Sequence, residues 1–169
     1  MDLNYFWIFM LAATPIWELR GAIPAGIFAF DLPWGWVLIV SLIGNIFPVP
    51  LILLFLDPIS NFLCQFPRME KIIRWVFERT RRKGELVTKY ERIGLMVFVA
   101  VPFPGTGAWT GSLIAFLLGM DLKSAFLPIA LGVLIAGVIV VALCLMGWVG
   151  ALIAGISLVI LAMMGLWKI

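Results

Sequence analysis

Glu18 and Arg20 are the residues of this sequence best suited to chemistry, because they place an acid and a base inside an apolar run. No other charge lies between Asp2 and Asp31. A charge that faces lipid at mid-depth costs about 2.5–3.5 kcal/mol on insertion scales. The two side chains must therefore be paired, hydrated or turned inward.

Two interpretations of this acid and base stay open. In the first, Glu18 and Arg20 form a structural ion pair that only stabilises the chain. In the second, the planar guanidinium of Arg20 binds a phosphate or carboxylate group. Glu18 then loses its partner and favours protonation, which would couple the movement of protons to that of an anion.

The tract that carries these charges, residues 14–30, is rich in residues that interrupt helices. Two prolines and two glycines, Pro15, Gly21, Pro24 and Gly26, fall within twelve positions, and each proline removes a backbone donor. The preceding charge-free run, residues 3–17, is shorter than the roughly 20 residues that a helix needs to cross a bilayer. We expect a re-entrant hairpin that breaks over residues 14–24 and returns over residues 25–30.

The composition is that of an integral membrane protein. Of the 169 residues, 64% are hydrophobic and the mean hydropathy is +1.15, against an apolar share of about half in soluble domains. Histidine is absent and the only cysteines are Cys64 and Cys144. We therefore expect no metal site, no disulfide and no cofactor.

Three longer runs are predicted to span the membrane, namely residues 34–56, 124–146 and 148–167. Pro48 and Pro50 should kink the first of them. Asn45 is the single amide in that run. It is interpreted either as a hydrogen-bonding contact between helices or as a group that lines a pore.

Residues 68–92 reverse this composition, with nine Lys or Arg against four Glu. The excess of positive charge predicts a cytoplasmic segment, and the spacing of its apolar residues predicts an amphipathic helix over residues 68–83. It is either an ordinary positive loop or a surface that gathers anionic lipid headgroups. The second interpretation names Arg79, Arg81, Arg82 and Lys83.

A second tract of helix-breaking residues, 101–112, interrupts the charge-free run 93–120 and predicts a second hairpin. Its polar side chains and glycine amides can face Arg20, although the same small residues can also serve only for close packing. Trp109 fits either packing or a cation-binding ring. The two hairpins together supply the candidate residues for binding substrate or ions: Glu18, Arg20, Gly21, Pro24, Pro102, Pro104, Gly105, Thr106, Gly107, Trp109, Thr110 and Ser112.

The two hairpins also form an internal repeat. A shift of 86 positions aligns residues 21–30 with residues 107–116, and matches Gly, Ala, Ala and Phe identically. With the basic segment in the cytoplasm, the hairpins enter from opposite faces, as in transporters with inverted repeats. The expected organisation is a single transmembrane domain. Residues 1–56 form the first repeat, 57–92 a basic linker, 93–146 the second repeat and 147–169 a final span.

The tracts Glu-Leu-Arg-Gly-Ala-Ile-Pro at residues 18–24 and Pro-Phe-Pro-Gly-Thr-Gly-Ala-Trp at 102–109 resemble the small multidrug export protein family, a distant relation of the DedA membrane proteins. The resemblance covers nearly the whole chain. It implies a compact protein of the prokaryotic cell membrane with two facing hairpins. The DedA relation implies transbilayer movement of lipid phosphates such as undecaprenyl phosphate, and the family's own name implies drug efflux. DedA proteins carry an arginine in the second hairpin, whereas this hairpin is uncharged.

We therefore expect a transporter or flippase of an anionic amphiphile that works between the two hairpins, with proton coupling through Glu18. The alternatives are proton-coupled efflux of lipophilic drugs and a membrane organiser that does not transport. No feature predicts an enzyme or a nucleic-acid partner. The expected partners are membrane lipids, the substrate and a second copy of the chain. The small residues that could join two copies are Gly132, Ala136, Gly137 and Val140, or Gly147, Gly150 and Ala154.

Overall fold

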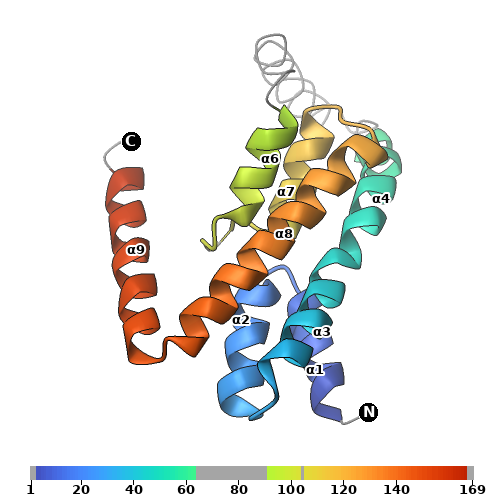
Figure 1. Cartoon of the computed structure of the whole chain (residues 1–169). Helices are drawn as coiled ribbons and strands as arrows, with labels where there is room; N and C mark the ends of the chain where they lie inside the picture. Colours follow the sequence, from blue (N-terminus) through green and yellow to red (C-terminus); the bar gives the residue numbers. More distant parts are fainter. Residues whose placement is uncertain (1–2, 64–90, 104, 167–169) are drawn as a thin grey trace.

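The computed structural model describes residues 3–63, 91–103 and 105–166, and Figure 1 shows that the described chain is built of helices joined by short loops. No strand occurs in these ranges, which confirms the predicted all-α class. The elements in chain order are α1 (Leu3–Ala13), α2 (Glu18–Pro24), the π-helix η1 (Ala25–Ala29), α3 (Trp34–Ile46), α4 (Pro48–Leu63), α6 (Glu91–Ala100), α7 (Ala108–Leu117), α8 (Leu122–Leu145) and α9 (Trp148–Leu166).

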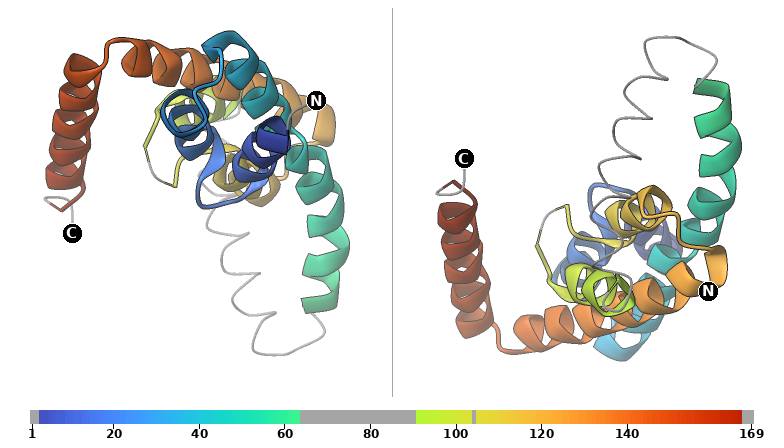
Figure 2. Two further views of the ribbon diagram at one scale, coloured as in Figure 1. Left: turned by 90° about the horizontal axis from the view of Figure 1, so that it is seen from below. Right: turned by 90° about the horizontal axis from the view of Figure 1, so that it is seen from above.

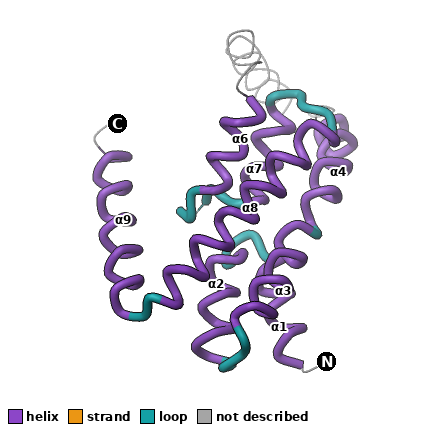
Figure 3. The backbone as a smooth tube through the Cα atoms, viewed as in Figure 1, coloured by secondary structure: helices purple, strands orange, loops and turns teal. Residues whose placement is uncertain are grey.

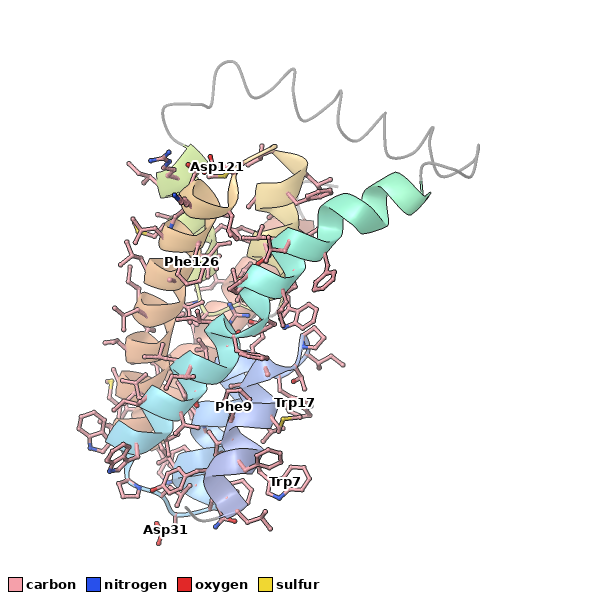
Figure 4. All side chains as sticks on the ribbon, turned by 90° about the vertical axis from the view of Figure 1, so that its right-hand side faces the viewer. Trp7, Phe9, Trp17, Asp31, Asp121 and Phe126 are labelled. Atoms are coloured by element: carbon pink, nitrogen blue, oxygen red, sulfur yellow. The ribbon has the colours of Figure 1, made fainter. Side chains whose placement is uncertain are left out.

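Two pairs of short helices occupy opposite ends of the molecule. In Figure 1, α1 and α2 lie at the lower end and α6 and α7 at the upper end, so that the loops inside the two pairs approach each other near the middle. Figure 4 places Asp31, which follows the first pair, and Asp121, which follows the second, at the two opposite ends. We call the two pairs the first and the second hairpin.

Two longer helical stretches run alongside both hairpins. Residues Trp34–Phe55 and Leu122–Leu145 are long and apolar enough to cross a membrane, which agrees with two of the predicted spans. The first stretch is interrupted at Phe47, between α3 and α4 (Figure 3). This interruption lies where Pro48 and Pro50 were predicted to kink the run, since neither proline can donate a backbone hydrogen bond. α4 then continues to Leu63, beyond the end of the charge-free run.

α9 stands away from the other helices, as the two views of Figure 2 show. It follows α8 after a tight turn in which Gly147 adopts a φ of +58°, a conformation that glycine reaches without strain. α9 contacts α8 near this turn, where Gly150 lies against Leu143. The helix lies where a third span was predicted, and its passage through a membrane stays a prediction.

Small residues bring the helices into close contact. Gly44 of α3 faces Phe9 and Ala12 of α1, and Gly132 of α8 faces Met96 and Val99 of α6. The first of the two small-residue rows predicted for a dimer is therefore buried inside one copy of the chain. All its members, Gly132, Ala136, Gly137 and Val140, are buried.

The outer ends of α6 and α8 are tied together by polar side chains. The carboxylate of Asp121 accepts a hydrogen bond from the Ser124 backbone N–H at 3.2 Å and thereby caps α8. Hydrogen bonds from the side chain and the backbone of Ser124 lower the pKa of the exposed Asp121 below its ordinary value. Arg92 of α6 donates to the Ser124 hydroxyl at 2.7 Å, so the two helix starts share one polar cluster.

The helix interruptions inside both hairpins are shorter than predicted. The prediction that the first break extends over residues 14–24 is wrong at its C-terminal end, because α2 begins at Glu18 and includes Gly21 and Pro24. Pro24 has no backbone N–H to donate within the helix. Directly after it the helix widens into η1, where the Phe30 N–H donates to the Ala25 carbonyl five residues earlier. In the second hairpin the helix resumes at Ala108, so the break predicted to run to residue 112 is also too long.

The close contact between α6 and α8 leads to a prediction that compares one substitution at two glycines. A Cβ atom at Gly132 would lie 2.7 Å from the Met96 carbonyl oxygen, whereas nothing lies within 4 Å of a Cβ at Gly94. Gly132→Ala should destabilise the protein by about 1–3 kcal/mol, because overpacking forces the helices apart. Gly94→Ala should be neutral or stabilising by up to about 1 kcal/mol, because alanine favours helix.

Thermal unfolding of both variants in detergent, followed by tryptophan fluorescence, measures the difference. Equal melting temperatures for the two variants would contradict the close packing of α6 on α8.

Candidate functional site

The loops of the two hairpins meet in the middle of the molecule, and side chains from each hairpin bind backbone groups of the other. The Trp109 indole N–H donates to the Ala13 carbonyl, at the last residue of α1, at 3.1 Å. In the opposite direction, Arg20 of α2 donates to the Val101 carbonyl, one residue beyond the end of α6, at 3.2 Å. Carbonyl groups at helix ends have no partner in their own helix. Trp109 provides one for Ala13, whereas the Val101 carbonyl also accepts from the Phe103 N–H and the Thr106 hydroxyl of its own loop.

Arg20 binds three groups at this meeting point. Its Nη1 atom lies 3.1 Å from Oε2 of Glu18 and forms an ion pair. Its Nη2 atom donates to the Val101 carbonyl and, at 3.1 Å, to the Thr106 hydroxyl oxygen. The Arg20 Nε atom is buried and has no hydrogen-bond partner in the described part of the chain. Arg20 therefore joins its own hairpin to the loop of the other.

Glu18 lies against the start of α7. A Cβ atom at Gly107 would overlap the Glu18 carboxylate, and the Trp109 backbone N–H donates to that carboxylate. Only 4% of Glu18 is exposed. The first N–H groups of a helix lack intrahelical partners and attract negative charge. Glu18 thus fills the anion-binding position at the N-terminus of α7 from outside that helix.

The backbone of Glu18 is strained. Its φ of +46° falls in the left-handed region, which a residue with a long side chain rarely adopts and which costs about 1–3 kcal/mol. The surrounding contacts must offset this energy. Because the conformation directs the Glu18 carboxylate to Gly107 and Arg20, the strain belongs to the site itself.

The two charges match the ends of the helices that they meet. Arg20 lies at the C-terminal end of α6, where the partial charge of a helix is negative, and Glu18 lies at the N-terminal end of α7, where it is positive. The ion pair is therefore stabilised by its surroundings as well as by its own attraction. We call this set the tip interface, consisting of Glu18, Arg20, Thr106, Gly107 and Trp109.

Thr106 holds the second loop in shape. Its hydroxyl oxygen lies 2.7 Å from the Val101 carbonyl and 2.9 Å from the Phe103 carbonyl, while it accepts from Arg20. Thr106 faces Arg20, as the sequence analysis expected for the polar side chains of this hairpin, but it accepts a hydrogen bond from Arg20 and donates within its own loop. Ser112, in contrast, donates to the Ala108 carbonyl of its own helix at 2.7 Å, so its hydroxyl is engaged away from Arg20.

The remaining predicted residues divide into three groups. Pro24 and Pro102 line the cavity described below. Gly21 packs on the Trp17 ring, Gly105 adopts a φ of +87° in the loop and Thr110 lies half-buried in the first turn of α7. Pro104 and the predicted headgroup cluster Arg79, Arg81, Arg82 and Lys83 lie outside the described residues.

A cavity of about 820 Å³ opens beside the tip interface. Arg20 is the only charged side chain among the described residues that line it. The rest of its wall is almost entirely apolar and comes from α2, η1, the loop after α6, the second half of α8 and the first half of α9. Its members besides Arg20 are Pro24, Phe28, Val101, Pro102, Phe103, Ile139, Val140, Leu143, Cys144, Gly147, Trp148, Gly150, Ala151 and Ile153.

Sequence reasoning did not identify the part of this wall that α8 and α9 provide. Residues such as Ile139, Leu143 and Trp148 carry no local signal, because apolar residues face lipid and cavities alike in a membrane segment. Nor did sequence reasoning identify the Val101 carbonyl, because a backbone oxygen that binds a distant side chain leaves no mark in the sequence. No group of three or more His, Cys, Asp or Glu side chains that could hold a metal ion occurs in the part of the chain that the structure describes.

The described residues thus form an all-helical structure with two stretches that are long and apolar enough to cross a membrane. The chain belongs to the small multi-drug export protein family. The family described as "Putative small multi-drug export protein" matches residues 18–139, which include the whole tip interface, the whole of the first long apolar stretch and most of the second. No curated protein and no solved structure matches the chain.

The contact between Glu18 and Gly107 predicts a double-mutant result. Gly107→Ala should destabilise the folded protein, because the new methyl group would overlap the Glu18 carboxylate. In a Glu18→Ala background the same change should lose most of this effect. Couplings between contacting residues are about 0.5–3 kcal/mol.

Unfolding of the four proteins in detergent measures this coupling. Gly35→Ala, at a glycine with open space around its Cβ position, is the control and should give the same small effect in both backgrounds. Additive effects of Gly107→Ala and Glu18→Ala would show that the two residues do not touch.

Proposed function

We propose that this protein moves an amphiphilic compound with an acidic group across the membrane, and that the compound binds in the cavity beside the tip interface. The observation that carries the proposal is that Arg20 is the single charged side chain among the described residues of an otherwise apolar wall. A cavity of about 820 Å³ falls within the range of about 300–1,000 Å³ that is usual for small-molecule sites. The family's description, which concerns export, supports a transport role.

Arg20 supplies the contact for the acidic group. Its planar guanidinium matches the paired oxygens of a phosphate or carboxylate, and its Nε atom has no partner among the described residues. An incoming anion would compete with Glu18 for the Arg20 Nη1 atom. Glu18 would stay at the start of α7. Once the anion has taken Arg20 from it, Glu18 would take up a proton, because it has lost its positive partner. Transport of the anion would in this way be coupled to protons.

The apolar wall suits the remainder of such a compound. α8 and α9 contribute Ile139, Leu143 and Trp148 to this wall. A hydrocarbon chain gains about 25 cal/mol for each Å² that it buries there. The finer proposal is therefore a lipid phosphate, for example a polyprenyl phosphate such as undecaprenyl phosphate.

We place the two hairpins in the membrane as re-entrant elements that enter from opposite faces. α1 has 11 residues and α6 and α7 have 10 each, which is roughly 15–17 Å of helix against about 30 Å of hydrocarbon. The hairpins start at opposite ends of the molecule and meet in its middle, and contacts between α2 and α8 are matched by contacts between α7 and α4. These features support an inverted repeat with a substrate site near the midplane.

A second candidate function is efflux of lipophilic drugs without an acidic group. The family's description favours it, and so does the apolar wall of the cavity. In this case Arg20 serves only the tip interface, and Glu18 is the carboxylate that exchanges protons. The two candidates differ in whether the substrate needs Arg20.

Reconstitution in liposomes distinguishes them. We expect the protein to move a fluorescent polyprenyl phosphate between leaflets, and Arg20→Gln to lower the rate roughly tenfold to 100-fold, because hydrogen bonds to charged groups contribute about 1.5–3 kcal/mol. Arg92→Gln, which removes an arginine at the outer end of α6, should keep the rate within about twofold.

A second variant guards against misfolding. Arg20→Gln leaves Glu18 buried without its charged partner, so the double variant Glu18→Gln with Arg20→Gln is measured beside it and should also be inactive. Unchanged movement of the phosphate by the folded double variant would contradict the proposal. Movement of a neutral lipophilic dye, but not of the phosphate, by the wild type would favour the second candidate.

A further inference from the structure

Two polar side chains of α3 are buried without partners. Ser41 is 0% exposed and Asn45 is 1% exposed. The Ser41 Oγ atom and the Asn45 Oδ1 atom have no hydrogen-bond partner among the described residues. Leaving a buried polar group unsatisfied costs about 1–3 kcal/mol, and such groups in folded proteins usually have a ligand, water or functional reason.

Ser112 shows what a buried serine of this protein does when it has only a packing role. Its hydroxyl donates to the Ala108 carbonyl, four residues earlier in the same helix, at 2.7 Å. The equivalent carbonyl for Ser41 is that of Val37, but Ser41 makes no such bond. Its oxygen is therefore free to bind something else, as is the oxygen of Asn45.

The two side chains lie on the same face of α3, close to the interruption of the helix. Ser41 and Asn45 are four residues apart on α3, so they share one face with about 5–6 Å between their Cβ atoms. One small ligand can touch both oxygens. The helix is interrupted directly after them, at Phe47, and Pro48 has no N–H to donate to the Gly44 carbonyl. The neighbourhood therefore offers a hydroxyl, an amide oxygen and a backbone carbonyl.

This group of oxygens lies at the depth of the tip interface. Gly44 packs against Phe9 and Ala12 in the last turn of α1. The next residue of α1, Ala13, accepts the hydrogen bond from Trp109. A ligand held by Ser41 and Asn45 would thus brace α3 beside the end of α1 that the second hairpin contacts.

We propose that Ser41 and Asn45, with the Gly44 carbonyl, bind a Na⁺ ion. Neutral oxygens suit a monovalent cation, whereas Ca²⁺ and Mg²⁺ sites use carboxylates. Carbonyls at helix interruptions coordinate Na⁺ in transporters that are built from broken helices. The inference stands apart from the proposed function, because it concerns binding to the folded protein and needs no transported substrate.

The test measures thermal stability of the purified protein in detergent, with NaCl or choline chloride at equal ionic strength. A ligand that binds only the folded state raises the melting temperature in proportion to the logarithm of its concentration once the site is mostly filled. The melting temperature of the wild type should rise with Na⁺ and not with choline. Ser41→Ala and Asn45→Leu should each abolish the rise.

Ser112→Ala is the matched control, since it deletes a buried hydroxyl that is already bonded within its helix, and it should keep the response to Na⁺. Binding of radioactive ²²Na⁺ to the wild type and to Ser41→Ala provides a second readout if Asn45→Leu does not fold. Equal melting temperatures of the wild type in Na⁺ and choline, or a Na⁺ response that survives Ser41→Ala, would overturn the proposal and leave a buried water as the ligand.

Discussion

The burial of Glu18 and Arg20 in an apolar chain is the constraint on which the rest of the structure depends. Neither charge can face lipid without a large cost, and the interrupted helices beside them have backbone groups that also need partners. The tip interface meets both needs with the same atoms. Arg20 binds the carbonyl after α6, Glu18 binds the start of α7, and the two bind each other.

This arrangement makes the two hairpins depend on each other. The first hairpin provides charges that the second loop requires, and the second provides the Trp109 donor for the end of α1. Any motion that separates the hairpins must break these bonds together, because they share the residues of one small region. A substrate that replaced Glu18 at Arg20 would weaken the contact without leaving a bare charge. The strained backbone of Glu18 would favour such a release.

The predictable part of the structure is the part that local chemistry determines. Prolines and glycines located both interruptions, the charge-free runs located the two long apolar stretches, and the isolated acid and base located the tip interface. The length of the second interruption was not predictable, because the helix resumes where a distant side chain meets its first turn. Glu18 lies against the first turn of α7, although the two are far apart in the sequence. No local sequence pattern near Ala108 predicts that contact.

The cavity wall was unpredictable for a related reason. Its α8 and α9 residues became neighbours of Arg20 only through the turn at Gly147 and the path of α8 across the molecule. Asn45 was recognised as unusual from its type alone, but only the fold shows that Ser41 accompanies it and that neither oxygen has a partner among the described residues.

The measurement that tests the central claim most directly is occupancy of the cavity, read at Cys144. This half-buried thiol lines the cavity with Arg20, and Cys64→Ser leaves it as the sole cysteine. We predict that dodecyl phosphate slows alkylation of Cys144 by a maleimide, that dodecanol does so much less, and that Arg20→Gln removes the difference. Equal protection by the phosphate and the alcohol, or protection by the phosphate that persists in Arg20→Gln, would contradict an anion site at Arg20.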